Sequence, residues 1–215
     1  MIKIALLGDS MVDTLFFGGK FWDLEILLKE KYPNKKFKLL NHGVGVTDAK
    51  IGLYRLTHDY DYKERNRHLP ALISEKADMI IVESFAYNHG PNTNKGIKDY
   101  KETISTIINT LKGETESELF LYAPISPNKH IYTKGISWLG WSEAERAKEY
   151  KATRVYLEEF IRLAKVIRLP LINTYNKSLD GDDGNVEYIS NVDGIHFSSV
   201  GRQLVAKEML TMLKY

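Results

Sequence analysis

The sequence begins with MIKIALLGDS, residues 1–10, and this segment sets the architecture expected for the rest of the chain. Its apolar run from residue 2 to residue 7 is typical of a strand that is buried on both faces of a parallel sheet. The run carries one lysine, is shorter than the apolar core of a signal peptide, and is followed at once by acidic Asp9. We therefore predict that residues 2–7 form the first strand.

Similar apolar runs recur along the chain, at residues 37–40, 79–82, 119–122 and 171–172. Between them, apolar residues spaced by threes and fours predict helices, for example from Tyr100 to Leu111. Strands that alternate with helices are typical of α/β folds with a parallel sheet. We predict one domain over residues 1–215, built as a three-layer α/β/α fold with about five parallel strands in a flavodoxin-like arrangement.

Two helix starts and one long loop complete this prediction. Ser142 and Glu145 form the pattern of a capping box, which predicts the start of a long helix, and Ser198 or Ser199 is expected to cap the last helix. Residues 124–141 contain prolines, glycines and tryptophans without a regular period. Because an ordered loop of this length is more often functional than a plain connection, we predict a lid or binding loop there.

Composition excludes several classes of protein. Lys and Arg number 30 against 28 Asp and Glu, and this formal net charge of +2 gives no support for a nucleic-acid partner. No stretch approaches the roughly 18 apolar residues that cross a bilayer, so we expect no membrane partner and a cytoplasmic location. The chain has 0 cysteines, which excludes a thiolate nucleophile and cysteine-ligated zinc.

Chemically capable residues follow the predicted strands, where ligands bind in open parallel sheets. Ser10 follows the first run, Gly45 the second and Asn88 the third, while Asp193 and His196 precede the last helix. A serine hydroxyl becomes a good nucleophile when an imidazole takes its proton, and a carboxylate can orient that imidazole. The pattern therefore favours nucleophilic catalysis by serine.

These motifs make the sequence resemble the SGNH, or GDSL-type, serine hydrolases, and they occur in the family's order over nearly the whole chain. The resemblance implies that Ser10 is the nucleophile and that Asp193 and His196 are its partners. It implies an oxyanion hole formed by the backbone N–H of Ser10, the side-chain amide of Asn88 and a glycine N–H. Family members usually place that glycine five residues beyond the asparagine that ends the second strand, a position occupied here by Val46. We assign Gly45, one residue earlier.

The loop at residues 124–141 contains two indoles that bear on the substrate. Trp138 and Trp141 are either anchors that hold the loop to the core or a platform for a sugar ring or acyl chain, to which Tyr87 can add. We treat these three as candidate substrate-binding residues. No metal site is assigned, because His42 and His89 lack the spacing of metal ligands.

The expected function is that of a serine esterase, a carboxylic ester hydrolase that forms an acyl-enzyme and needs no cofactor. A small acyl ester is the expected substrate and partner, with an O-acetyl group on a carbohydrate as the first candidate. A hydrolase of lipid esters or thioesters is one alternative, and a catalytically silent α/β binding module is another. The sequence makes no prediction of the oligomeric state.

Overall fold

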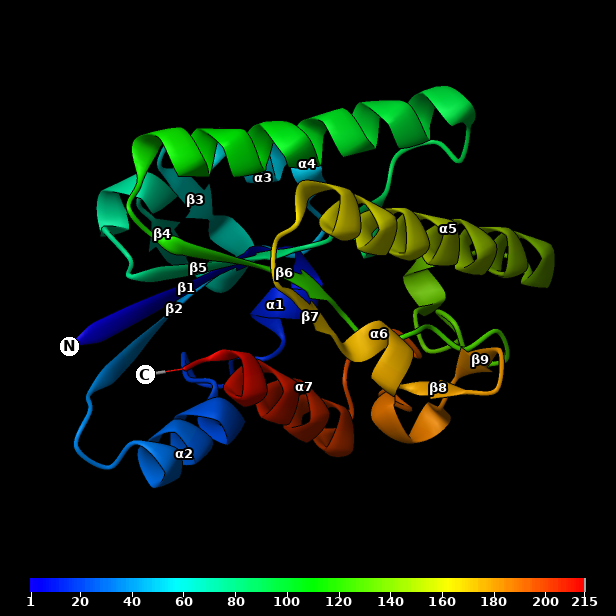
Figure 1. Ribbon diagram of the computed structural model, residues 1–215. Coiled ribbons are helices and arrows are strands. Elements are labelled where there is room, and N and C mark those ends of the chain that lie inside the picture. The colour runs from blue at the N-terminus through cyan, green and yellow to red at the C-terminus, as the bar shows by residue number, and fades with distance from the viewer. Residues whose placement is uncertain (215) are drawn as a thin grey trace.

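A five-stranded parallel sheet forms the centre of the computed structural model, which describes residues 1–214 (Figure 1). Its strands lie in the order β2-β1-β5-β6-β7. Their bounds are β1 (Ile2–Gly8), β2 (Phe37–Gly43), β5 (Met79–Glu83), β6 (Glu118–Ala123) and β7 (Leu171–Asn173). The five predicted strands are confirmed, and their order is that of flavodoxin-like sheets, in which the chain changes direction across the sheet after the first strand pair.

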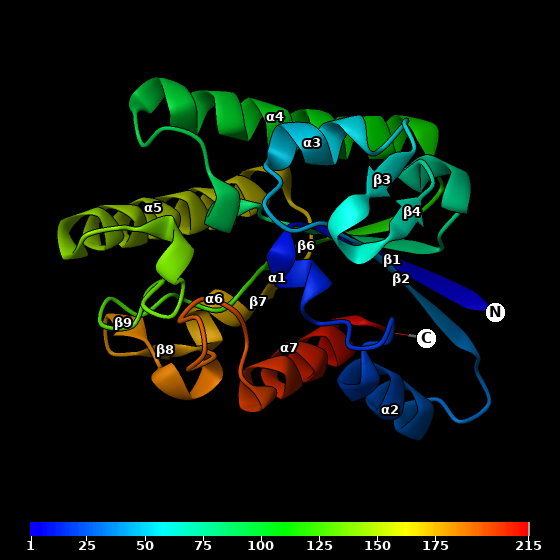
Figure 2. The same ribbon diagram turned by 180° about the vertical axis from the view of Figure 1, so that it is seen from behind.

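Helices cover both faces of this sheet (Figures 1 and 2). One face carries α3 (Ala49–Tyr54), α4 (Asn94–Glu114) and α5 (Glu143–Ile167), and the other carries α2 (Trp22–Lys31) and α7 (Ser199–Met212). The short helices are α1 (Ser10–Asp13) and α6 (Thr174–Lys177), with 3₁₀ turns η1 (Lys63–Arg65), η2 (Leu72–Glu75), η3 (Ala86–Asn88), η4 (Ser137–Leu139) and η5 (Val186–Tyr188). The helices of residues 1–214 include none with the length and apolar character of a membrane span.

Both predicted helix starts are present. The Ser142 side chain accepts the backbone N–H of Glu145, whose carboxylate in turn accepts the backbone N–H of Ser142, which completes the capping box of α5. Ser198, rather than Ser199, caps α7 by accepting the backbone N–H of Gly201 at 3.0 Å. Each cap satisfies a donor that the first turn of a helix leaves free.

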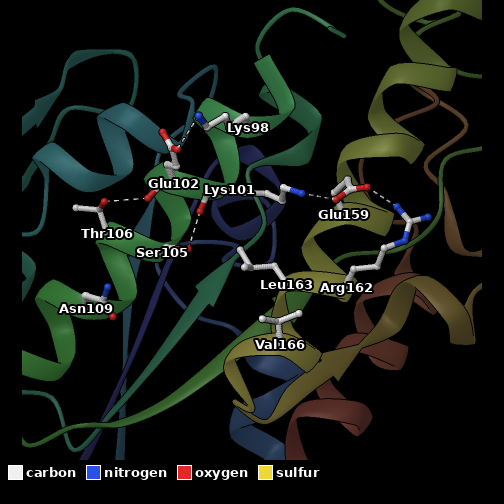
Figure 3. Close-up of a pocket in the computed structure, with 10 residues that line it drawn as sticks. All are labelled: Lys98, Lys101, Glu102, Ser105, Thr106, Asn109, Glu159, Arg162, Leu163 and Val166. Atoms are coloured by element: carbon white, nitrogen blue, oxygen red, sulfur yellow. Dashed lines mark hydrogen bonds and ion pairs between the residues drawn. The ribbon is translucent and has the colours of Figure 1, made fainter. Parts of the chain in front are cut away.

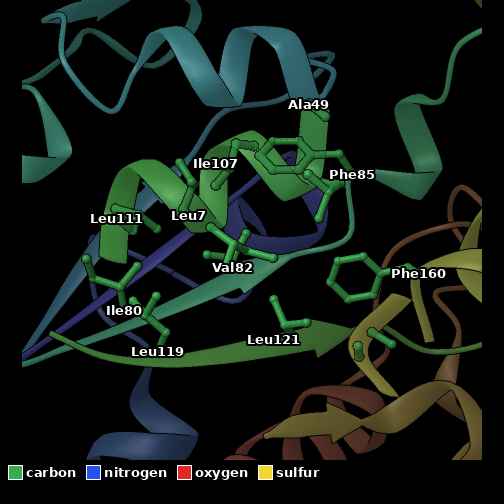
Figure 4. Packing of buried hydrophobic residues seen from close by; sticks show 14 of the residues in the cluster. Leu7, Ala49, Ile80, Val82, Phe85, Ile107, Leu111, Leu119, Leu121 and Phe160 are labelled. Atoms are coloured by element: carbon green, nitrogen blue, oxygen red, sulfur yellow. The ribbon is translucent and has the colours of Figure 1, made fainter. Parts of the chain in front are cut away.

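The three central strands, β1, β5 and β6, are mostly apolar because both of their faces are buried. In β1, Ala5 and Leu7 pack into the core layer beneath α4 and α5, whereas Ile4 and Leu6 pack on the side of α2 and α7. Figure 4 shows Leu7 among the side chains of the first layer, with residues of α4 and α5 beside it. Successive strand residues point to opposite faces, so a sheet between two helix layers requires an uninterrupted apolar run.

Two small hairpins were not predicted. β3 (Tyr60–Tyr62) pairs with β4 (Arg67–Leu69), and β8 (Leu179–Asp180) pairs with β9 (Asp183–Gly184), both antiparallel. Their strands have two or three residues and carry polar side chains, so they give no apolar run. Figure 2 shows the β3–β4 hairpin beside α3.

Candidate active site

Ser10, His196 and Asp193 meet at the carboxyl end of β1. Ser10 begins α1, and His196 and Asp193 lie in the loop that precedes α7. His196 Nε2 is 2.9 Å from Ser10 Oγ, although the two residues are 186 positions apart in the sequence. His196 Nδ1 is 2.8 Å from Asp193 Oδ2. The fold thus joins a hydroxyl, an imidazole and a carboxylate in one chain of hydrogen bonds.

The charge of Asp193 determines which ring nitrogen of His196 carries the proton. Burial alone raises the pKa of Asp193, but hydrogen bonds from the His196 ring and from the backbone N–H of Ile195 outweigh it and bring that pKa below its ordinary value. An ionised carboxylate only accepts hydrogen bonds, so His196 Nδ1 carries hydrogen, and in the neutral ring Nε2 then accepts the hydrogen bond from the Ser10 hydroxyl. This tautomer is the one that can take a proton from an attacking serine.

Asp9 is fully buried directly behind Ser10 and orients two neighbouring groups. Its Oδ1 accepts the backbone N–H of Met11 at 2.7 Å, which starts α1, and its Oδ2 accepts Nδ2 of Asn88 at 2.8 Å. Burial raises the pKa of Asp9, while the hydrogen bonds from Met11 and Asn88 favour its charged form, and in this arrangement the NH₂ group of Asn88 faces Asp9. The second hydrogen of that NH₂ group is then available to a ligand beside Ser10.

A second buried carboxyl group, Glu83, lies next to Asp9 at the end of β5. Its Oε2 accepts the backbone N–H of Asp9 at 3.3 Å, and its Oε1 accepts the hydroxyl of Ser84 at 2.6 Å. Burial, and then the charge of Asp9, raise the pKa of Glu83 well above its ordinary value. Sequence reasoning did not select Glu83, and its only signal was an acidic residue that directly follows the apolar run at residues 79–82.

Two arginines hold the strand ends that carry this site. Arg55, which is 1% exposed, donates from Nη1 to the His42 carbonyl at 2.6 Å and from Nη2 to the Gly8 carbonyl at 2.9 Å. Burial lowers the pKa of Arg55 to about 10, so it stays charged at neutral pH. Arg67 of β4 donates to the Gly43 carbonyl at 2.8 Å and pairs with Asp13 of α1. No sequence pattern had identified either arginine.

The turn after β2 contains both candidates for the oxyanion-hole N–H. A Cβ placed on Gly45 would lie 3.9 Å from Ser10 Cβ, so the turn adjoins the serine. The N–H of Gly45 already donates to the Tyr62 hydroxyl at 3.1 Å. Val46, with a φ of 58°, has no backbone N–H partner among residues 1–214, and neither has Ser10.

The loop of residues 124–141 packs against the segment that carries Asp193. A Cβ on Gly135 would overlap the carbonyl oxygen of Val192, and one on Gly194, whose φ is +72°, would overlap that of Ile131. Glycine is therefore required on both sides of this contact, because only hydrogen fits there. The loop lies against the histidine side of the site.

The three candidate substrate-binding residues have different environments. The Tyr87 hydroxyl donates to the Ile125 carbonyl at 2.8 Å and so ties η3 to the loop. Trp141 is half-buried, and its carbonyl accepts from Arg146. Trp138 is 77% exposed, so the interpretation of Trp138 as a core anchor is wrong. Its indole is free to contact a ligand.

Two surface hollows differ in their relation to Ser10. A hollow of about 470 Å³ beside the candidate oxyanion residues is lined by Val46, Asp48, Lys50, Ile51, Asn88 and His89. Another, of about 460 Å³, lies between α4 and α5, where Lys101 and Arg162 both pair with Glu159 (Figure 3). Only the first adjoins the residues gathered at the strand ends. Among residues 1–214, no three histidine, aspartate or glutamate side chains group closely enough to hold a metal ion.

Comparison with known proteins finds matches among solved structures, at low sequence identity. No family model and no curated protein sequence matches the chain. The structure is similar to that of a lipase/acylhydrolase from Enterococcus faecalis, with a TM-score of 0.68 and 21% identity over 99% of this chain and 95% of that one.

Two acetyl xylan esterase structures are also similar. One, the acetyl xylan esterase AlAXEase, gives a TM-score of 0.65 at 16% identity, covering 99% of this chain and 100% of that one. The other, an acetylxylan esterase from Geobacillus stearothermophilus, gives 0.62 at 15% identity, covering 98% and 93%. The α/β fold of the chain is therefore the fold of these structures over nearly their full lengths.

Proposed function

We propose that the protein is a serine ester hydrolase of the SGNH type, with Ser10 as its nucleophile. The observation that carries this proposal is the hydrogen-bonded chain from Ser10 Oγ through His196 to Asp193. These three residues lie at the carboxyl end of the sheet, beside β1. The neighbours of β1 are β2 on one side and β5 on the other, so successive strands are added in opposite directions from this point. Open α/β sheets bind their ligands at this point.

The three hydrogen-bonded residues divide the work of this reaction between them. Ser10 Oγ attacks the ester carbonyl carbon while His196 Nε2 takes its proton, and His196 then protonates the departing alcohol oxygen. Water, activated by the same imidazole, hydrolyses the resulting acyl-enzyme. Asp193 holds the reactive tautomer of His196 and stabilises the imidazolium that forms.

Negative charge on the carbonyl oxygen requires donors that are already in place. The Ser10 N–H and the NH₂ group of Asn88, held by Asp9, supply two of them in this proposal. For the third we infer the N–H of Val46 in place of that of Gly45, because the Tyr62 hydroxyl engages the Gly45 N–H. Removing one donor of this kind commonly lowers turnover by about 10²–10³.

A small acyl ester on a carbohydrate, with acetyl as the first candidate, is the proposed substrate. The hollow beside Asn88 is lined by the charged side chains of Asp48 and Lys50 and by His89, which suits a hydroxyl-rich leaving group. Exposed Trp138 offers a flat surface of the kind that sugar rings contact. The similarity to acetyl xylan esterase structures points the same way.

A lipid ester is the second candidate. The similar Enterococcus faecalis structure is that of a lipase/acylhydrolase, and Val46 exposes 81% of its surface beside the hollow. A longer acyl chain would contact such apolar side chains. Activity against esters of increasing chain length separates the two candidates.

The test combines covalent labelling with hydrolysis. A fluorophosphonate probe should label the wild-type protein and leave Ser10→Ala unlabelled, because the probe needs an activated serine. Hydrolysis of p-nitrophenyl esters of rising chain length and of acetylated xylo-oligosaccharides should fall by about 10³ or more in Ser10→Ala. A protein that neither reacts with the probe nor hydrolyses any ester would instead be a silent binding module.

A further inference from the structure

The turn that follows β2 contains a strained residue. Val46 has a φ of 58°, in the left-handed region that β-branched residues rarely adopt. Val46 is also 81% exposed, so its own side chain gains little from packing that could hold this conformation. A strained backbone persists only where surrounding contacts fix it, and such residues cluster at functional sites.

Contacts within the turn account for part of its position. The Val44 N–H donates to the Gly8 carbonyl at 3.1 Å, which continues the pairing of β2 with β1. The Thr47 hydroxyl donates to the Val44 carbonyl at 2.7 Å. The second bond holds the carbonyl of the peptide group between Val44 and Gly45, and the N–H of the same group needs a partner of its own.

Tyr62 supplies the partner for the N–H of this peptide group. Its hydroxyl oxygen accepts the Gly45 N–H at 3.1 Å, and it reaches the turn from the β3–β4 hairpin, outside the main sheet. Tyr62 is 7% exposed and packs with Val44 and Leu69. The ring is therefore itself fixed and can act as a rigid acceptor.

The hairpin is attached to both elements that meet at the site. Arg67, paired with Tyr62 across the hairpin, lies with its guanidinium 5.5 Å from the Tyr62 ring centroid. The same guanidinium bonds the Gly43 carbonyl at the end of β2 and Asp13 in the helix that begins with Ser10. Through Arg67, the position of Tyr62 is therefore linked to that of the helix that carries Ser10.

We propose that Tyr62 is a positioning residue of the oxyanion hole. Its hydroxyl accepts the Gly45 N–H and so holds the turn in one conformation. In that conformation the Val46 N–H is free to donate to the carbonyl oxygen of an ester bound beside Ser10. Without the hydroxyl, this peptide group is held only through its carbonyl, by Thr47, and Val46 can more readily leave its strained conformation. This inference rests on the proposed serine hydrolase function.

The experiment compares Tyr62→Phe with the matched variant Tyr60→Phe. Tyr60 lies on the same strand, and its hydroxyl makes no hydrogen bond within residues 1–214. Active sites are counted by fluorophosphonate titration, and kcat and KM are then measured per active site with p-nitrophenyl acetate. Tyr62→Phe should lower kcat by about three- to tenfold, as expected for the loss of one hydrogen bond, with KM changed less than twofold. Tyr60→Phe should leave both within twofold.

A double-mutant cycle tests the contact itself. An alanine Cβ at residue 45 would lie 2.7 Å from the Tyr62 hydroxyl, closer than Cβ atoms approach, whereas the next ring atom is 3.8 Å away. Gly45→Ala should therefore lower kcat more than tenfold in the wild-type background and less than threefold in the Tyr62→Phe background. Equal losses in both backgrounds would contradict the proposed contact.

Different results would contradict the role of Tyr62 and the proposed hydrolase function. If the wild type is labelled and active but Tyr62→Phe keeps the kcat of Tyr60→Phe, Tyr62 has no positioning role. A lower melting temperature with unchanged kcat per labelled site would also exclude that role, because it marks a structural contact only. If the wild type is neither labelled nor active, the serine hydrolase function fails and this inference with it.

Discussion

Acidification should destabilise this protein through His42, a histidine buried at the end of β2. Its side chain is 3% exposed, and Nδ1 has no hydrogen-bond partner. Burial, and then the positive charges of Arg55 and Arg67, lower the pKa of His42 from 6.5 to about 4. Glu75 lies 3.8 Å from Nε2, beyond hydrogen-bond distance, and does not offset these effects.

The size of the effect follows from linkage between protonation and folding. Below pH 6.5 the unfolded chain binds a proton at His42, while the folded protein does not until the pH nears 4. The free energy of unfolding therefore falls as the pH drops through this window. The loss is about 2 kcal/mol between pH 7 and pH 5, and it approaches about 3 kcal/mol at lower pH.

Urea unfolding at several pH values measures this loss in the wild type and in His42→Gln. The variant cannot titrate at this position, so its unfolding free energy should fall by about 2 kcal/mol less between pH 7 and pH 5. In a protein of this size that difference corresponds to about 4–8 °C in Tm. His130→Gln, at an exposed position, is the matched control and should follow the wild type. Equal pH slopes for the wild type and His42→Gln would refute the reasoning.

Three further predictions concern catalysis. Asp193→Asn should lower kcat/KM less than His196→Ala does, because hydroxyl activation survives in part without the orienting carboxylate; the reverse order, in assays of ester hydrolysis, would give Asp193 another role. Asn88→Ala should lower kcat by about 10²–10³ with a smaller change in KM, and a variant with wild-type kcat would remove Asn88 from the oxyanion hole. Trp138→Ala should change the ratio of kcat/KM between acetylated sugars and p-nitrophenyl acetate while Tm stays within about 2 °C, because the indole is exposed; unchanged ratios would exclude it from substrate contact.

The main sheet could be predicted from sequence because its central strands, β1, β5 and β6, are buried on both faces. Such strands are continuous apolar runs, and the helices between them show their own period. The hairpins β3–β4 and β8–β9 gave no such signal, because strands of two or three residues that include charged side chains form no apolar run and resemble turns. Trp138 could not be placed either, because an indole in an aperiodic loop can face the core or the solvent.

The positions of the site residues followed from the sheet, whereas the contacts that hold them did not. Ser10, Asn88 and His196 are next to predicted element ends, so the topology alone brings them to one edge. Which N–H of the turn after β2 is free depends on the Tyr62 hydroxyl, which comes from an unpredicted hairpin. Residue spacing alone therefore could not determine whether Gly45 or Val46 supplies the backbone N–H of the oxyanion hole.

Arg55 and Glu83, which contact the backbone at the strand ends, could not be predicted because their charges are buried. Sequence patterns place charged side chains at the surface, yet Arg55 and Glu83 are 1% and 0% exposed. Arg55 donates to the carbonyls of Gly8 and His42 at once, and the Gly8 carbonyl accepts the Val44 N–H as well. Such a residue fixes two neighbouring strand ends with one side chain. The spacing between Ser10 at the end of β1 and the turn after β2 therefore depends on a buried cation that no periodicity reveals.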